Sequence, residues 1–273
     1  MVKLYSKENF KEVLTWIEPC VSDPLFSNPN FDLEGIKEFL SKAQPKDNIF
    51  LVYTALGTGI FAFDVVEEEC YIEMIFAYAR EESVYEEMFD YLFKTYAGYQ
   101  LDIVFNPNHP YIHNLAVHYK GEFYPVQISM QFNSTLKCEH NDHVIEYREE
   151  YFDQYRKIHS TDTYYTAEKV VKQNDFKVFL VLHQQSVVGY IDIKRVQNGN
   201  YFIYDFLVEE SYRNQGYGKA LLREALSQMK GSLVSLTVDI DNEIALHLYK
   251  NLGFYKIPFS ESVFVSINID KIE

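Results

Sequence analysis

The stretch Tyr201–Gly218, YFIYDFLVEESYRNQGYG, decides how the second half of this chain folds. Its first eight residues are mostly aromatic or β-branched, which is typical of a strand. A polar loop that ends at Gly216 follows, with Gly218 two residues later, and residues 219–229 then place apolar side chains at helical spacing. We therefore expect a strand over 201–208, a loop over 209–216 and a helix over 217–229.

The junction between this loop and the helix has the composition of an anion-binding site. Gly216 and Gly218 carry no Cβ, so backbone N–H groups can come close to a bound anion. The first N–H groups of a helix have no internal partner and carry the positive end of the helix dipole. Arg213 and Lys219 add positive side chains on either side. The pattern predicts a phosphate-binding turn between a strand and a helix.

Two motifs in this region resemble those of the GNAT family of acetyl-coenzyme A-dependent N-acyltransferases. Residues 213–218, RNQGYG, are similar to the family's Arg/Gln-x-x-Gly-x-Gly/Ala signature. Residues 242–254, NEIALHLYKNLGF, resemble its second signature. A strand expected over 233–238 separates the two motifs, and the resemblance covers roughly residues 144–269.

This resemblance implies that the second half of the chain binds acetyl-CoA as a cosubstrate and uses no metal. The loop amides and Arg213 would hold the pyrophosphate. The backbone of the preceding strand, together with Asn242, would hydrogen-bond the pantetheine arm. The cofactor-binding residues implied in this way are Phe206, Leu207, Val208, Arg213, Asn214, Gln215, Gly216, Tyr217, Gly218, Lys219 and Asn242.

Acyl transfer to an amine also needs a proton donor for the leaving thiolate and a proton acceptor for the amine. By resemblance, Tyr249 is the general acid, and a phenol with a reference pKa near ~10 suits an alkyl thiol. The alternative is an ordinary core tyrosine, one of 23 in the chain. Asp205 is the preferred base and Asp239 the second candidate, with deprotonation through water as a further option. Regular strand alternation places Asp205 on one face with Ile203 and Leu207.

The elements expected before residue 135 repeat the order of those after residue 144. Each half reads as helices, three strands, a helix, a strand, a helix and closing strand, which indicates an internal duplication of roughly 135 residues. We therefore predict an α/β protein with two tandem GNAT-like domains, 1–135 and 144–273. Each has a central mixed, mostly antiparallel sheet flanked by helices. The polar segment 133–143 is the expected boundary.

The two closing strands complete this expectation. Residues 123–132 should close the first sheet as one strand, and strands near 254–257 and 262–267 should pair at the end of the second.

The first half lacks the chemistry of the second, because the counterpart of the phosphate loop, residues 80–87 (REESVYEE), has no glycine and four carboxylates. Those carboxylates would repel a pyrophosphate. We interpret the first half as a catalytically degenerate copy that supports the fold and lines one wall of a substrate cleft.

Composition and charge narrow the range of partners. The chain has 273 residues and a formal net charge of −15, which disfavours nucleic acids and anionic membrane surfaces and favours an amine-bearing partner. Its three cysteines form no pair motif, its N-terminus is too polar for a signal peptide, and no apolar run reaches ~18 residues. We expect a soluble, cytoplasmic protein, monomeric or homodimeric, that acts on a small-molecule or peptide amine.

These observations lead to one functional hypothesis and two alternatives. The hypothesis is an N-acetyltransferase that moves the acetyl group of acetyl-CoA to a primary amine by direct attack within a ternary complex. No cysteine lies in the motif region to carry the acyl group covalently. The first alternative is a non-catalytic acyl-CoA-binding sensor or scaffold protein. The second is an acyltransferase that uses a longer or an aminoacyl donor.

Overall fold

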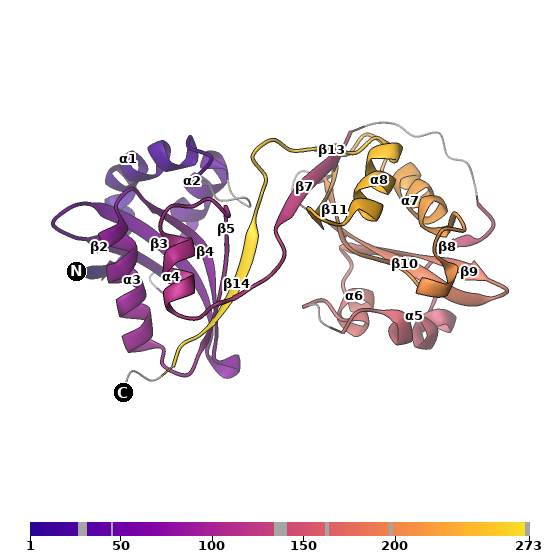
Figure 1. The fold of residues 1–273 in the computed structure, drawn as a ribbon, viewed down its shortest axis with the longest axis horizontal. Coiled ribbons are helices and arrows are strands. Elements are labelled where there is room, and N and C mark those ends of the chain that lie inside the picture. The colour runs from indigo at the N-terminus through magenta and orange to yellow at the C-terminus, as the bar shows by residue number, and fades with distance from the viewer. Residues whose placement is uncertain (27–31, 45, 134–140, 162–163, 197–198, 271–273) are drawn as a thin grey trace. The chain divides into compact units, whose positions relative to one another are not determined.

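The computed structural model describes the chain except for residues 27–31, 45, 134–140, 162–163, 197–198 and 271–273 (Figure 1). The described residues form two seven-stranded mixed sheets, each within its own compact unit. The first unit comprises residues 1–127 and 259–273, and the second comprises residues 128–258. Most neighbouring strands pair antiparallel and helices cover both faces of each sheet, as the α/β prediction requires.

The first unit has the strand order β1-β2-β3-β4-β5-β14-β6. Its helices cover the two faces in pairs, α1 with α2 on one and α3 with α4 on the other. The strands are β1 (Val2–Leu4), β2 (Asn48–Tyr53), β3 (Thr58–Val66), β4 (Tyr71–Ala79), β5 (Gln100–Phe105), β6 (Glu122–Phe123) and β14 (Val263–Asn268). The helices are α1 (Phe10–Val21), α2 (Leu33–Lys42), α3 (Glu82–Thr95) and α4 (Ile112–His118).

The second unit has the strand order β13-β7-β12-β11-β10-β9-β8. One face of its sheet packs against α5 and α6, and the other against α7 and α8. The strands are β7 (Gln127–Phe132), β8 (Val144–Glu146), β9 (Phe176–His183), β10 (Ser186–Arg195), β11 (Tyr201–Val208), β12 (Val234–Asp239) and β13 (Tyr255–Lys256). The helices are α5 (Phe152–Ile158), α6 (Ala167–Lys172), α7 (Tyr217–Gln228) and α8 (Glu243–Leu252).

Residues 201–229 fold as expected. The predicted strand is β11, and the predicted helix is α7 with its end one residue earlier than expected. Apolar side chains three and four residues apart share one face of a helix. That face of α7 is buried, because Leu221, Leu222, Ala225, Leu226 and Met229 are each at most 3% exposed.

Each sheet contains one strand from the other half of the chain. β7, which ends the first half, lies between β12 and β13 in the second unit. β14, the last strand among the described residues, lies between β5 and β6 in the first. Both exchanged strands carry core residues of the sheet they join, including Met130 and Phe132 in β7 and Val265 and Ile267 in β14. The exchange is therefore part of both hydrophobic cores.

This exchange corrects the expected closing strands. Residues 123–132 form two strands in different sheets, β6 and β7. The segments expected to pair near 254–257 and 262–267 do not pair with each other, because β13 pairs with β7 and β14 pairs with β5 and β6. Alternation predicts that a segment is a strand but not which sheet accepts it.

The compact units consequently divide the chain after residues 127 and 258. The domains expected from the duplication are 1–135 and 144–273, so the two divisions differ by the exchanged strands. Most of the expected boundary segment, residues 134–140, lies outside the described residues.

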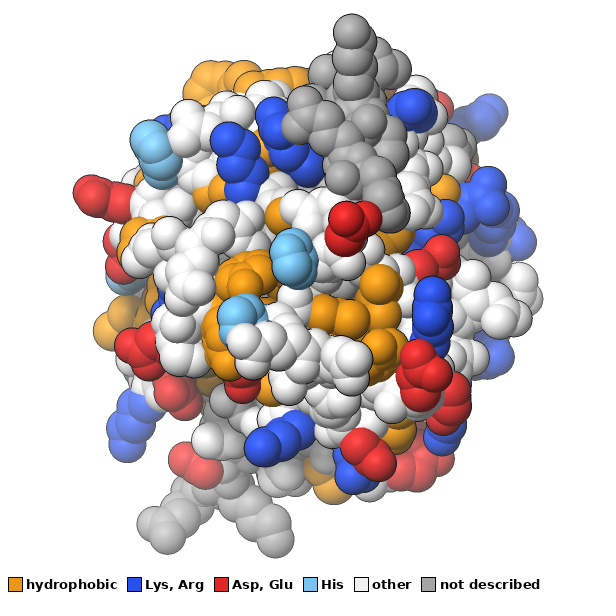
Figure 2. All heavy atoms as spheres, turned by 90° about the vertical axis from the view of Figure 1, so that its right-hand side faces the viewer, with side chains coloured by type: hydrophobic (Ala, Val, Ile, Leu, Met, Phe, Trp, Pro, Cys, Tyr) orange, Lys and Arg blue, Asp and Glu red, His pale blue; other side chains and the backbone are white. Residues whose placement is uncertain are grey.

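The surface and the helix lengths bear on the predicted partners. Figure 2 shows acidic and basic side chains interspersed on one face, with histidines beside a small apolar area. No helix in the described part of the chain is both long enough and apolar enough to cross a bilayer.

We predict that the first unit cannot complete its core without β14. A chain truncated after residue 258 lacks β14, so the β5 backbone loses its antiparallel partner and Ile103 loses its pairing with Val265. Hydrogen exchange measured by mass spectrometry should show lost protection in β5 and retained protection in β10 and β11. A chain ending at residue 270 is the control and should keep both. Full protection of β5 in the shorter chain would contradict the prediction.

Candidate functional site

β11 and β12 run side by side only where they begin. Their parallel pairing joins Tyr201 to Val234 and Phe202 to Ser235, although β11 continues to Val208. On its other side β11 stays paired with β10 as far as Val208. Among the described residues, the β12-facing backbone edge of residues 205–208 therefore has no strand partner. Backbone N–H and C=O groups along such an edge are available to a ligand.

The hydrogen bonds around β11 show which of its amides point to this open edge. Glu209 donates its N–H to β10, so its neighbour Val208 directs its N–H and C=O the opposite way. Phe206 shares that direction by alternation. The Phe206 N–H donates to the Asp205 carboxylate (2.8 Å), and the Val208 carbonyl accepts from Arg213 Nε (3.0 Å). These two bonds occupy the Phe206 N–H and the Val208 carbonyl, so the Phe206 carbonyl and the Val208 N–H are the edge groups that face a ligand.

A β-bulge at Tyr204 changes which face Asp205 occupies. The register between β10 and β11 shifts there by one residue. Ile203 packs into the core under α7 and α8, whereas Leu207 packs against the core under α5 and α6. Asp205 lies on the side of Leu207, where its carboxylate accepts the Tyr190 hydroxyl proton (2.6 Å). Regular alternation had placed Ile203, Asp205 and Leu207 on one face, and the extra residue of the bulge separates them.

The loop between β11 and α7 has the geometry of an anion-binding turn. Asn214 (φ 61°) and Gly216 (φ 88°) have left-handed backbones, and Gly216 is the N-cap of α7. A Cβ added to Gly216 would meet no atom within 4 Å, so the approach to the helix N-terminus is open on that side. A Cβ added to Gly218 would lie 3.3 Å from Phe206 Cζ, so glycine there lets α7 pack closely on β11.

The side chains of this loop are arranged in two ways. Arg213 and Lys219 are exposed, and a hollow of about 570 Å³ beside the loop is lined by Leu207, Glu209, Glu210, Ser211 and Arg213. Gln215 and Tyr217 instead bond within the fold. The Gln215 amide donates to a loop carbonyl (3.0 Å), and the Tyr217 hydroxyl lies 2.7 Å from Nδ1 of His183. Gln215 and Tyr217 thus offer a ligand their backbone groups.

The first unit repeats the strand divergence without the loop. β4 pairs with β5 only over Tyr71–Met74, although β4 continues to Ala79. Only Arg80 and Glu81 separate β4 from α3. The Tyr85 hydroxyl donates to the Ala79 carbonyl at the end of β4 (3.3 Å). Within residues 71–95, all of which are described, the first unit has no glycine-bearing turn before the helix, as the degenerate-copy interpretation requires.

Tyr249 of α8 lies in the core beneath α7. It is 6% exposed, and its ring is 6.4 Å from Phe206 and 5.6 Å from Phe254 between centroids. Burial, and to a smaller extent the charge of Asp205, raises the pKa of Tyr249. The phenol therefore keeps its proton at neutral pH, as a proton donor must.

The other predicted site residues lie at strand and helix ends. Asn242 is the N-cap of α8, and its side-chain oxygen accepts the Ala245 N–H (3.1 Å). Its amide NH₂ remains a donor for a second partner. Asp239, the second candidate base, is the last residue of β12, on the strand that has diverged from β11. Of the two carboxylates, Asp205 is the one on β11 beside the open edge.

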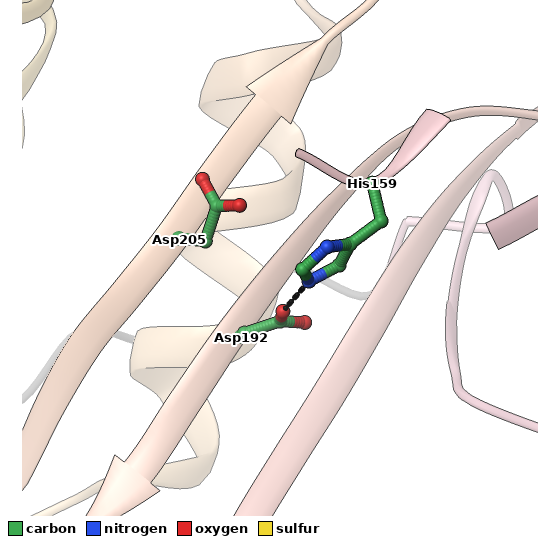
Figure 3. A group of neighbouring side chains, drawn as sticks. All are labelled: His159, Asp192 and Asp205. Carbon is green, nitrogen blue, oxygen red and sulfur yellow. Dashed lines mark hydrogen bonds and ion pairs between the residues drawn. The ribbon is translucent and has the colours of Figure 1, made fainter. Parts of the chain in front are cut away.

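A buried polar network next to Asp205 was not expected from the sequence. Asp192 of β10 is 1% exposed and His159, which follows α5, is 5% exposed. His159 Nε2 lies 2.9 Å from Asp192 Oδ2, with Asp205 on the neighbouring strand (Figure 3). The Tyr155 hydroxyl lies 2.9 and 2.8 Å from the two oxygens of Asp192. An aspartate inside the apolar run of β10 is the signal that could have revealed the network.

This network favours a charged histidine. Nδ1 of His159 lies 2.8 Å from the Ser160 carbonyl, which can only accept, while Nε2 faces the Asp192 carboxylate. Burial alone would lower the pKa of His159, but the hydrogen bonds to Asp192 and Ser160 outweigh it and raise that pKa. Burial raises the pKa of Asp192, against the hydrogen bonds from His159 and Tyr155. With both ring nitrogens facing oxygen atoms, we favour the imidazolium–carboxylate form.

We predict that this pair makes stability fall as the pH rises above neutral. The His159 pKa is higher in the folded chain than its unfolded value of ~6.5, so its contribution is complete below that pH and is lost as pH passes the folded value. Calorimetric unfolding between pH 6 and 9 should show a smaller alkaline loss in His159→Gln than in the parent. Replacement of the exposed His247 is the control. Equal slopes in parent and His159→Gln would contradict the prediction.

The comparisons with known sequences point to one family. Residues 144–254 match the acetyltransferase (GNAT) family model. Over 75 residues the chain is 36% identical to N-alpha-acetyltransferase RimI of Mycobacterium tuberculosis, covering 26% of this chain and 48% of that protein. It is 35% identical over 75 residues to the uncharacterized protein ML0378 of Mycobacterium leprae, covering 26% and 21%. The chain thus spans half or less of the length of these relatives.

Solved structures resemble the chain along its whole length. A GCN5-related N-acetyltransferase from Sphaerobacter thermophilus has a TM-score of 0.68 at 12% identity, covering 99% of this chain and 96% of that one. A tandem GNAT protein from the clavulanic acid biosynthesis pathway has a TM-score of 0.56 at 11% identity, covering 100% of both chains. At these identities the likeness shows the fold alone, and it confirms the tandem arrangement. The chain has a tandem GNAT fold, and its residues 144–254 match the acetyltransferase (GNAT) family model.

Proposed function

We propose that the second unit is an N-acetyltransferase that moves an acetyl group from acetyl-CoA to a primary amine. The observation that carries the proposal is the junction of β11 and α7, where an open backbone edge leads to an anion-binding helix N-terminus. An extended arm that ends in a pyrophosphate fits such a junction. The family of residues 144–254 supports acetyl-CoA as that ligand.

The loop amides, from Asn214 to Lys219, would hold the pyrophosphate of this ligand. The left-handed Gly216 leaves their approach open. Arg213 donates its Nε–H to the Val208 carbonyl, and its other guanidinium N–H groups can donate to a phosphate. Lys219 adds an exposed positive charge.

The strand and the second motif would hold the pantetheine arm. Phe206 and Val208 direct their backbone groups to the open edge, where Asp205 already takes the Phe206 N–H and Arg213 the Val208 carbonyl. The Phe206 carbonyl and the Val208 N–H would pair with the amides of the arm. Leu207 directs its backbone to β10, so we assign it a contact through its side chain instead. The free donor capacity of the Asn242 amide would reach the same arm.

Acetyl-CoA supplies an activated thioester carbonyl. In direct attack the amine nitrogen forms a bond to that carbon and the carbon–sulfur bond breaks, while the nitrogen loses a proton and the sulfur gains one. The Asp205 carboxylate would accept the amine proton, and Tyr249 would donate its proton to the sulfur. The Val208 amide, whose N–H faces the open edge, is the donor that would polarise the carbonyl.

The bulge at Tyr204 gives these two proton-transfer groups separate positions. Tyr249 packs beside Phe206 on the α7–α8 face, whereas Asp205 lies on the α5–α6 face. A ternary complex needs both substrates bound together, and opposite faces of one strand allow each its own approach. This arrangement supports direct transfer without an acyl-enzyme.

The acceptor is proposed from charge and from one relative. The M. tuberculosis relative is named an N-alpha-acetyltransferase, so a peptide N-terminus is the first acceptor to test. Glu209 and Glu210 line the hollow beside the loop, and the chain carries a net charge of −15, which favour a cationic amine. Basic peptides and small polyamines are therefore the acceptors that we propose to test.

A non-catalytic acyl-CoA sensor or scaffold is the second candidate. It would use the same loop and open edge, and one observation favours it. Each oxygen of Asp205 is already engaged by a donor within the protein, Tyr190 or the Phe206 amide. An acyltransferase with a longer donor would be distinguished by comparing acetyl, succinyl and longer thioesters.

We predict that acetyl-CoA raises the unfolding temperature of the parent and not that of Gly216→Glu. A ligand present at about 100 times its Kd that binds only the folded state adds ~2.7 kcal/mol to stability. A glutamate at position 216 brings negative charge to the anion site. Gly231→Glu is the matched control, because Gly231 is also left-handed with no atom within 4 Å of an added Cβ. A shift that survives in Gly216→Glu would argue against the loop as the binding site.

We predict that Tyr249→Phe lowers kcat by about 100-fold or more, the usual contribution of general acid catalysis. The substitution removes one oxygen and leaves the ring between Phe206 and Phe254, so binding of acetyl-CoA should persist. Thiol release is measured with basic peptides and amines as acceptors. Tyr255→Phe removes an exposed hydroxyl of the same unit and serves as the control. Turnover by the parent with no loss in Tyr249→Phe would remove Tyr249 from the mechanism.

A further inference from the structure

We propose that Tyr190 is a positioning residue for Asp205 and that the buried His159–Asp192 pair holds Tyr190 in place. The inference rests on the proposed function, because it concerns the carboxylate assigned to accept the amine proton. It assigns a task to four residues outside both GNAT motifs. These are Tyr155, His159, Tyr190 and Asp192.

Tyr190 contacts Asp205 directly. The Tyr190 hydroxyl donates to Oδ2 of Asp205 (2.6 Å), and the Phe206 N–H donates to Oδ1 (2.8 Å). With one donor on each oxygen, the carboxylate plane has a defined orientation. Tyr190 is fully buried while Asp205 is partly exposed. An accessible carboxylate is thus anchored to an immobile ring.

The neighbours of the Tyr190 hydroxyl determine the direction in which its proton points. Its oxygen accepts the Ser160 N–H (3.0 Å), and a backbone amide can only donate. The hydroxyl proton therefore points to Asp205. Two rings fix the tyrosine itself. The His159 imidazole stacks on it at 4.9 Å and 15°, and Tyr155 meets it edge-on at 5.3 Å between centroids.

The His159–Asp192 ion pair supports these rings. His159 bonds the Ser160 carbonyl through Nδ1 and Asp192 through Nε2. Ser160 is thereby fixed at both backbone groups, its carbonyl by His159 and its N–H by Tyr190. Asp192 is fixed in turn by the Tyr155 hydroxyl on α5. The contacts join α5, the residues after it, β10 and β11 into one rigid support for Asp205.

Burial of this pair suggests a role beyond stability. Removing two charges from water is unfavourable, and apolar residues of similar volume often stabilise a fold as well or better. Here the charges fix orientation instead. The direction of the Ser160 N–H, and hence of the Tyr190 proton, depends on where the imidazole holds the Ser160 carbonyl.

A metal ion is the competing explanation for the same residues. The ligand atoms of His159, Asp192 and Asp205 lie within 4.8 Å of one another, and a carbonyl on the far nitrogen also suits a metal-bound histidine. The hydrogen bonds favour the positioning role. Both carboxylates already accept tyrosine hydroxyl protons, and Nε2 bonds directly to Asp192.

The proposal has a specific kinetic consequence. Without the Tyr190 hydroxyl, Asp205 keeps only the Phe206 amide and can rotate away from the amine. A displacement of about 1 Å in a reacting group can cost ~100-fold in rate. The acetyl-CoA loop and the open edge of β11 do not involve Tyr190, so binding of that substrate should not change.

The test compares Tyr190→Phe with Tyr147→Phe. Tyr147 belongs to the same unit, and its hydroxyl also donates to a carboxylate, that of Glu149 (3.0 Å), away from Asp205. We expect Tyr190→Phe to lower kcat by 10- to 100-fold, roughly, with KM for acetyl-CoA unchanged. Tyr147→Phe should retain the kcat of the parent. An unchanged kcat in Tyr190→Phe would overturn the proposal.

Crystal structures of the parent and Tyr190→Phe keep the proposal testable without an acceptor. We expect the Asp205 carboxylate to leave its position beside β10 only in the variant. An unmoved carboxylate would overturn the positioning role whether or not the chain is an enzyme. Absent turnover with a moved carboxylate would instead overturn the proposed function alone.

The competing metal site is tested with Zn²⁺ and Mn²⁺ alone. We expect neither ion to raise the unfolding temperature of the parent. A rise in the parent that is lost in Asp192→Asn would overturn the positioning role in favour of a metal site.

Discussion

The candidate binding site of the second unit depends on the separation of β11 from β12 after Phe202. The two strands pair at only two positions, and the separation leaves backbone groups of β11 without a strand partner among the described residues. Unpaired backbone groups are costly in a protein interior, so this edge needs either water or a ligand. The loop that follows places a helix N-terminus at the end of the same edge. One interruption of a sheet thus produces both parts of a site for an extended anionic molecule.

Much of this arrangement could be predicted, because local chemistry determines it. The aromatic run of β11, the glycines at 216 and 218 and the apolar face of α7 each favour one conformation independently of the rest of the chain. Tyr249 could be placed on a helix by the second motif, although only the structure shows how deeply its ring is buried. The loss of an anion-binding loop in the first half could also be predicted, since residues 80–87 carry four carboxylates where an anion would bind.

The rest depends on tertiary contacts. The bulge at Tyr204 leaves no local signal, yet it moves Asp205 to the other face of the sheet. His159 and Asp192 are 33 residues apart and meet only when β10 packs under α5. The exchange of β7 and β14 is equally hidden, because an alternating segment suits any sheet with a matching apolar face. Residues that act through such contacts have to be found in three dimensions.

The exchanged strands also constrain the order in which the chain can fold. Synthesis proceeds from the N-terminus and domains usually fold as they emerge. Here the sheet of the first unit receives β14 from residues 263–268, the last described strand of the chain. The β5 edge that β14 covers must stay unpaired until residues 263–268 have been synthesised, a long-range closure that slows folding. The second unit, whose strands end at Lys256, can finish before the first, so the half made last is the half that folds first.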